Sequence, residues 1–188
     1  MAIVFALYWG YEQAMWAIIA GAAFDFFDGM SARLLGVSSP IGKELDSLAD
    51  VVTFGVAPSA MLFRLMMDYN GLYTLNMEEG LLRDVLTLTL YLMPFLAFLM
   101  AAFSALRLAK FNLDERQAMG FIGLPTPANA LFWGSLIVGW GTKIAAITAI
   151  VPILTVMMLA SCYLLVSEIP MFALKFKTWG WKGNEVKW

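Results

Sequence analysis

Long apolar stretches without charged side chains dominate the chain and predict helices that span a membrane. A spanning helix needs about 20 consecutive, mostly apolar residues. Residues 85–106 and 144–167 meet this condition without a single charge. Residues 117–142 are also uncharged, but glycines and prolines interrupt their first third, so we predict a loop there and a span over residues 126–141.

Two earlier apolar segments, residues 11–35 and 42–67, carry acidic residues near one end. Together with the later stretches they give five full spans. Residues 1–9 are apolar but too short to cross a bilayer, and they lack the basic start and the cleavage site of a secretory signal. They look like the second half of a helix whose first half lies upstream. We therefore expect an all-α integral membrane protein, a six-span helical bundle whose first span is truncated.

The composition agrees with a membrane protein and excludes several other classes. Of the 188 residues, 61% are hydrophobic and 14% are charged, and the mean hydropathy is +0.76. Soluble domains are about half apolar and about a quarter charged. A disordered chain, a nucleic-acid binder and an ordinary soluble enzyme are therefore excluded. There is no histidine to serve as a base or metal ligand, and we expect the single cysteine, Cys162, to be a small core residue.

The charges of the connecting segments predict the orientation in the membrane, because basic segments stay on the cytoplasmic side. Residues 34–43 and 107–123 and the C-terminal end are basic, whereas residues 68–84 are acidic. The acidic ends of the first two full spans then meet at the cytoplasmic face. We expect a transmembrane catalytic domain over residues 1–170 and a basic, aromatic cytoplasmic tail over residues 171–188. The expected location is the inner membrane of a bacterium.

Four aspartates form the most informative pattern in the chain. Asp25 and Asp28 are three positions apart, and Asp46 and Asp50 are four apart, so each pair shares one face of its helix. The loop between the two helices is short, which makes them antiparallel neighbours whose carboxylates can converge. Acids inside a span are costly and repel one another, so a cation must lie between them. Oxygen ligands without histidine or cysteine favour Mg²⁺ or Mn²⁺, and four carboxylates can hold two such ions.

The neighbouring residues indicate what such a metal pair would act on. A two-metal site is a common clamp for displacement at phosphorus. Gly29 and Ala32 share the face of Asp25 and leave room for a ligand against the helix. Arg33 suits a diphosphate because its guanidinium can donate two parallel hydrogen bonds. The pattern therefore predicts a site for phosphoryl transfer.

Other interpretations of the acids stay open. They could simply belong to the solvent-exposed cytoplasmic ends of two helices, although four acids on two facing helix surfaces make this a weak explanation. Intramembrane acids also mark ion paths, so a divalent-cation transporter is an alternative function. A transporter usually places its site near the membrane midplane at broken helices, whereas these acids gather at one face. A purely structural scaffold leaves the acids unexplained.

The aspartate region resembles the signature of the CDP-alcohol phosphotransferase family, D-x2-D-G-x2-A-R-x8-G-x3-D-x3-D. The residues that match its defined positions are Asp25, Asp28, Gly29, Ala32, Arg33, Gly42, Asp46 and Asp50. The chain also resembles the bacterial members of the family that use L-serine as the acceptor alcohol, at residues 42–50, 54–58, 107–112 and 121–127.

This resemblance implies a reaction and a set of residue roles. The enzyme would transfer the phosphatidyl group of CDP-diacylglycerol to L-serine and release phosphatidylserine and CMP. Asp50 carries over as the general base. The implied ligands of two divalent cations, Mg²⁺ or Mn²⁺, are Asp25, Asp28, Asp46 and Asp50. The implied residues of the nucleotide and diphosphate site are Gly29, Ala32, Arg33 and Gly42.

The acceptor alcohol must be recognised separately. Arg107 and Lys110 are at the cytoplasmic end of a span, where they could meet the carboxylate of serine, and Asn112 could add a hydrogen bond. Equally, Arg107 and Lys110 could be ordinary residues of a basic loop or could bind lipid headgroups. A family member that uses glycerol phosphate or inositol phosphate is the nearest alternative, but such acceptors favour an additional basic cluster. The resemblance also implies a homodimer, with CDP-diacylglycerol, L-serine and membrane lipid as partners and no nucleic acid.

Overall fold

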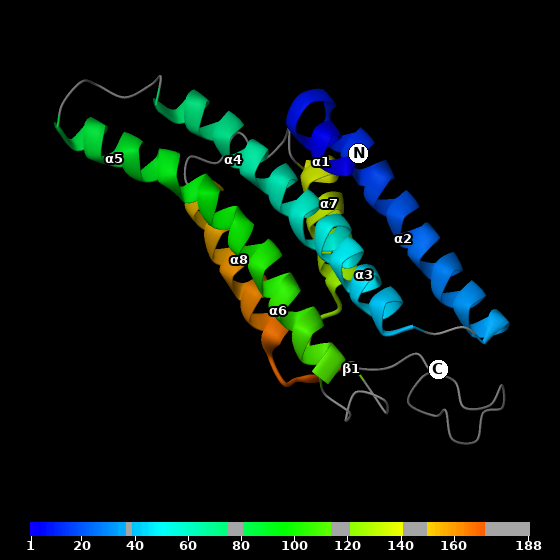
Figure 1. Ribbon diagram of the computed structural model, residues 1–188. Helices are drawn as coiled ribbons and strands as arrows, with labels where there is room; N and C mark the ends of the chain where they lie inside the picture. The colour runs from blue at the N-terminus through cyan, green and yellow to red at the C-terminus, as the bar shows by residue number, and fades with distance from the viewer. Residues whose placement is uncertain (37–38, 75–80, 114–120, 141–149, 172–188) are drawn as a thin grey trace, which may run out of the picture.

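The protein is a bundle of helices that run up and down past one another (Figure 1). The computed structural model describes residues 1–36, 39–74, 81–113, 121–140 and 150–171. The first part forms α1 (Ala2–Val4), the π-helix η1 (Phe5–Trp9) and α2 (Tyr11–Leu35). The middle forms α3 (Pro40–Asp50), the π-helix η2 (Val51–Val56), α4 (Ala57–Thr74), α5 (Leu81–Leu92), the 3₁₀-helix η3 (Met93–Phe98) and α6 (Leu99–Leu113). The last part forms β1 (Phe121–Ile122), α7 (Thr126–Trp140), α8 (Ile150–Val166) and β2 (Pro170–Met171).

The helices follow the apolar stretches of the sequence. α2 coincides with the predicted segment 11–35, and α7 begins at the predicted position. In the described part of the chain, two helical runs are long and apolar enough to cross a membrane, Pro40–Asn70 and Thr87–Leu113. α8 is a shorter apolar helix, and residues 144–149 of its predicted span lie outside the described residues.

The turn between α2 and α3 makes these helices antiparallel neighbours (Figure 1). Gly36 ends α2 with a φ of 62°, a left-handed conformation that glycine adopts without steric cost. Ser39 then caps α3, because its Oγ accepts a hydrogen bond from the backbone N–H of Gly42 at 2.9 Å. Pro40 occupies the first turn, where its missing N–H costs nothing. This turn brings the two aspartate pairs to the same end of the bundle.

Both long helical runs depart from α geometry near their middle. The π-helix η2 begins at the residue after Asp50, and such segments are frequent at functional sites. A Cβ atom at Gly55 would lie 3.1 Å from the Cβ of Ser104, so the glycine allows η2 to approach α6 closely. In the other run, η3 contains Pro94, which cannot donate the backbone hydrogen bond of an α-helix. The sequence pattern predicted both runs but neither distortion.

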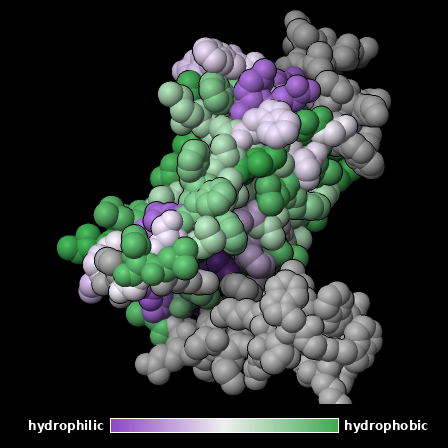
Figure 2. Space-filling model, turned by 90° about the vertical axis from the view of Figure 1, so that its right-hand side faces the viewer, coloured by the Kyte–Doolittle hydropathy of each residue, from purple (hydrophilic) through white to green (hydrophobic). Residues whose placement is uncertain are grey.

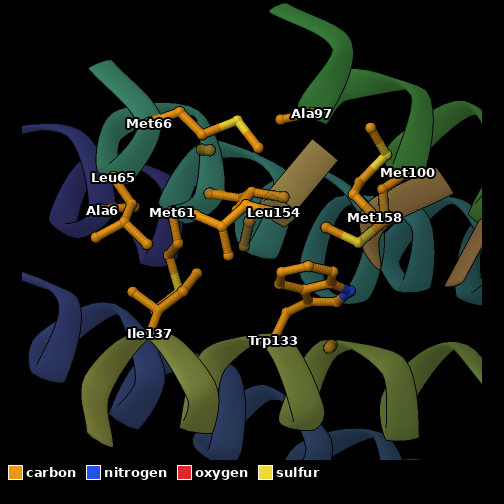
Figure 3. Packing of buried hydrophobic residues seen from close by; sticks show 14 of the residues in the cluster. Ala6, Met61, Leu65, Met66, Ala97, Met100, Trp133, Ile137, Leu154 and Met158 are labelled. Carbon is orange, nitrogen blue, oxygen red and sulfur yellow. The ribbon is translucent and has the colours of Figure 1, made fainter. Parts of the chain in front are cut away.

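The core lies between α4, α7 and α8 and the start of α6 (Figure 3). Leu154 and Met158 lie next to the ring of Trp133 (Figure 3), whose Nε1 donates to Ser161 Oγ at 3.1 Å. Methionine fills irregular gaps well, which suits a core made by several crossing helices. Cys162 is 2% exposed, which confirms that it is a core residue.

The N-terminal segment packs on α4 at the opposite end of the bundle from the turn that joins α2 and α3. Arg64 donates to the carbonyl of Ala6 at 3.0 Å, and Tyr11 Oη donates to Asp68 Oδ2 at 2.7 Å. These bonds hold η1 and the start of α2 against α4.

A two-residue antiparallel ladder departs from the purely helical expectation. Phe121 pairs with Met171 and Ile122 with Pro170, so the segment before α7 lies beside the segment after α8. Gly123 follows with a φ of 74°, and a Cβ atom there would lie 2.8 Å from the carbonyl oxygen of Leu165. The predicted loop is therefore anchored to the end of α8 and starts α7 at a defined place.

Candidate active site

The four aspartates of the sequence pattern line one pocket. Asp25 and Asp28 reach it from α2, and Asp46 and Asp50 reach it from α3, so the pocket lies between these helices and the start of η2. Its volume is about 520 Å³. Asp25 and Asp50 are half-buried, whereas Asp28 and Asp46 are exposed. The antiparallel turn thus gathers carboxylates that are distant along the chain.

The pocket concentrates negative charge. Asp25 experiences the negative charges of Asp46 and Asp28. Asp50 experiences the charges of Asp25 and Asp46 and, with the opposite sign, that of Arg107. Like charges gathered in a partly buried pocket are unfavourable unless cations neutralise them.

The donor set fits hard divalent cations. All four side chains offer oxygen ligands, as Mg²⁺ and Mn²⁺ prefer. Among the described residues, no three acidic or thiol side chains are placed to hold one ion on their own.

Three of the predicted nucleotide residues, Gly29, Ala32 and Gly42, are not among the residues that line the pocket. Gly29 and Ala32 are exposed on α2, and a Cβ atom at Gly29 meets nothing within 4 Å. Gly42 is exposed in the first turn of α3. Arg33 belongs to α2, and its side chain lies outside the described part of the structure. The face of α2 next to the aspartates is therefore open to a ligand at Gly29.

The three residues predicted to meet the acceptor differ in their surroundings. Arg107 is 7% exposed and stacks over the ring of Phe111 at 5.5 Å from its centre, whereas Lys110 is exposed. Among the described residues, Nε and Nη2 of Arg107 have no hydrogen-bond partner. Asn112 Nδ2 donates to Ser47 Oγ at 2.9 Å, which ties the end of α6 to α3. The structure thus brings Arg107 to Asp50 and leaves Lys110 at the surface.

Two buried polar residues near the start of α7 were not predicted as site residues. Thr126 and Asn129 are both 0% exposed. Within the described residues, Oγ1 of Thr126 and both amide atoms of Asn129 have no hydrogen-bond partner. Their spacing of three positions at the start of an otherwise apolar helix was the available sequence signal.

The chain belongs to the CDP-alcohol phosphatidyltransferase family, whose model matches residues 1–179. Members of this family generally use divalent cations, which agrees with the oxygen ligands in the pocket.

Individual relatives carry a more specific name. The chain is 37% identical over 131 residues to the CDP-diacylglycerol–serine O-phosphatidyltransferase of Bacillus subtilis, and the match covers 68% of the chain and 61% of that protein. Proteins of the same name from Mycobacterium leprae and Methanocaldococcus jannaschii are 32% and 40% identical over 183 and 108 residues. Those matches cover 90% and 57% of the chain, and 52% and 42% of the relatives. The chain therefore spans about half the length of the curated relatives that it matches.

Proposed function

We propose that this protein transfers the phosphatidyl group of CDP-diacylglycerol to L-serine and releases phosphatidylserine and CMP. The observation that carries the proposal is the gathering of Asp25, Asp28, Asp46 and Asp50 in the wall of one pocket. The family and the names of the relatives support the choice of donor and acceptor.

The proposed step is a direct displacement at phosphorus. The serine hydroxyl oxygen forms a bond to the phosphorus that carries the diacylglycerol, and the bond from that phosphorus to the CMP oxygen breaks. CMP leaves with the bonding electron pair. Asp50 accepts the hydroxyl proton, because it is half-buried in the wall of the aspartate pocket and the sequence contains no histidine. No covalent intermediate with the enzyme is needed.

The remaining pocket residues would hold and orient the donor. Asp25, Asp28, Asp46 and Asp50 would ligate two divalent cations, Mg²⁺ or Mn²⁺, which supply charge neutralisation at the diphosphate and acidify the hydroxyl. The open surface at Gly29 leaves room for the nucleotide against α2. Ala32, Arg33 and Gly42 complete the proposed nucleotide and diphosphate site.

The acceptor side is best supported by Arg107, which is buried and faces Asp50. Its guanidinium would pair with the carboxylate of serine. Asn112 would act through its bond to Ser47, which positions α6 against α3. Lys110 is exposed, which suits the alternative role at lipid headgroups.

The surface supports a place in the membrane. Figure 2 shows a face on which apolar residues cover the middle and hydrophilic residues gather toward the ends. Large apolar side chains such as Trp16, Phe24 and Val156 are 67–75% exposed. We propose a multi-pass transmembrane catalytic domain over residues 1–170, a cytoplasmic tail over residues 171–188, and a homodimer. Its proposed location is the inner membrane of a bacterium, with the aspartate pocket toward the cytoplasm.

The test is CMP release by the purified protein in detergent. The protein is incubated with CDP-diacylglycerol and Mg²⁺ or Mn²⁺, with L-serine, glycerol phosphate, inositol phosphate or no acceptor. Serine-dependent release that a chelator abolishes supports the proposal. Release with another alcohol but not with serine keeps the reaction class and overturns the acceptor. Silence with every acceptor, together with divalent-cation uptake into sealed vesicles, would favour a transporter instead.

A further inference from the structure

We propose that the acceptor binds inside the bundle, against Arg107 of α6 and Thr126 and Asn129 of α7, and that these side chains select a small amino acid with a free carboxylate. This inference rests on the proposed function and adds two residues to its acceptor side. It starts from a set of buried polar side chains that we call the internal polar layer. Its members are Ser59, Ser104, Arg107, Thr126, Asn129 and Ser161.

The internal polar layer lies at the end of the core that faces the aspartates. α4 and α7 run away from that end, and α6 and α8 run toward it (Figure 1). The polar residues accordingly come early in α4 and α7 and late in α6 and α8. The apolar core shown in Figure 3 occupies the next turns of the same helices.

Helix geometry directs the two α7 residues into the bundle. Thr126, Asn129 and Trp133 are spaced by three and four positions, so they share one face of α7. Trp133 points from α7 into the core (Figure 3). The segment η2, which starts directly after Asp50, packs against both α6 and α7. Arg107 and the α7 pair thus belong to the two helices that pack against the segment directly after the proposed base.

Hydrogen bonding divides the layer into two groups. The three serines have partners, since Ser59 donates to Gly55, Ser104 donates to Met100, and Ser161 donates to Met158. Among the described residues, polar atoms of Arg107, Thr126 and Asn129 have none. Buried polar groups are nearly always satisfied, and leaving one unpaired costs free energy. Three such residues on the two helices that pack against η2 indicate a polar ligand.

The chemistry of the group fits an amino acid. Arg107 is the one charged side chain among the described residues that are buried, so it offers one cation to one carboxylate. The Asn129 amide oxygen and the Thr126 hydroxyl can accept hydrogen bonds from an ammonium group. A phosphorylated alcohol carries more negative charge and would face the same single cation. The buried group therefore favours serine over the phosphorylated acceptors.

The experiment uses Thr126→Val and Asn129→Leu in the full chain, assayed by CMP release. Each change removes polar atoms at similar volume. The KM for L-serine should rise at least about tenfold, because a hydrogen bond to a charged ligand group is lost. The KM for CDP-diacylglycerol should stay unchanged. The melting temperature should stay the same or rise, since the removed atoms have no protein partner in the described residues. Thr126→Ser, which keeps the hydroxyl, should retain the wild-type KM.

Thr155→Val is the matched control, because Thr155 is a buried threonine of α8 whose hydroxyl already donates to Val151 at 2.9 Å. It should leave both KM values unchanged. An active wild type with an unaltered KM for serine in both α7 variants would overturn this inference and leave the proposed function standing. A parallel rise in both KM values with a lower melting temperature would show a structural role and would also overturn it. A wild type that releases no CMP with any alcohol would overturn both proposals.

Discussion

Replacing Gly29 by alanine should have opposite effects on the stability of α2 and on the affinity for the substrate. Gly29 lies inside α2 and is exposed, and a Cβ atom built on it meets no other atom within 4 Å. The new methyl group therefore causes no clash in the protein. Alanine is favoured over glycine by about 1 kcal/mol in a helix interior. For a chain of this size, that difference raises the melting temperature by about 2–4 °C.

The same methyl group would stand where the nucleotide of CDP-diacylglycerol is proposed to lie against α2. Overpacking a close contact costs about 1–3 kcal/mol, and about 1.4 kcal/mol corresponds to a tenfold loss of affinity. We therefore expect Gly29→Ala to raise the KM for CDP-diacylglycerol about tenfold while it stabilises the fold. The measurements are CMP release over a range of CDP-diacylglycerol concentrations at saturating serine, and thermal unfolding of the same preparation.

Gly139 provides the matched control for this experiment. It is also an exposed helical glycine with nothing within 4 Å of a built Cβ atom, but it belongs to the far end of α7. Gly139→Ala should raise the melting temperature and leave the KM unchanged. An unaltered KM in Gly29→Ala would refute the placement of the nucleotide on α2. An equal rise in KM in both variants would show that stiffening any helix impairs the enzyme.

Three further predictions concern single contacts of the site. Asp50→Asn should reduce kcat by at least about a hundredfold with little change in CDP-diacylglycerol binding. Glu44→Gln, which changes an exposed acid of the same helix, should leave kcat unchanged. Equal loss of binding and turnover in Asp50→Asn would contradict its role as base. Ser39→Ala should lower the free energy of unfolding by about 1 kcal/mol because α3 loses its cap. Ser39→Asp should retain the wild-type stability because aspartate can also cap the helix. Equal unfolding temperatures in the alanine variant and the wild type would contradict the capping role. A double-mutant cycle of Asn112→Ala and Ser47→Ala should give a coupling of about 1 kcal/mol in thermal unfolding, and additive effects would show that their hydrogen bond contributes nothing.

The helices and the convergence of the aspartates were accessible from the sequence because both depend on local rules. Charge-free apolar runs predict helices, and residues three or four apart share a face. Gly36 and Ser39 add stop and start signals that place the turn between α2 and α3. With a short turn, the two aspartate pairs have to meet. The pocket between these helices is thus a consequence of spacing and connection alone.

The acceptor side could not be derived in the same way because it depends on contacts between distant helices. The sequence treats Arg107 and Lys110 alike, as basic residues at the end of one span. They are three positions apart on α6, yet Arg107 is buried and Lys110, nearly one turn closer to the end of the helix, is exposed. No motif marks Asn129, and its spacing of three positions from Thr126 became informative only with its burial without a partner in the described residues. Local periodicity predicts which face a residue occupies but not what lies opposite.

Asp50 has a place in the fold that none of the other three aspartates shares. It is the last residue of α3, and the π-helix η2 begins at the next position. It experiences the charges of Asp25 and Asp46 in the pocket and, with the opposite sign, that of buried Arg107. A base for this reaction must touch the acceptor hydroxyl while the donor diphosphate is bound beside it. Asp50 experiences both kinds of charge, which supports the proposal that it is the base as well as a metal ligand, with Asp25, Asp28 and Asp46 as residues that would serve the donor.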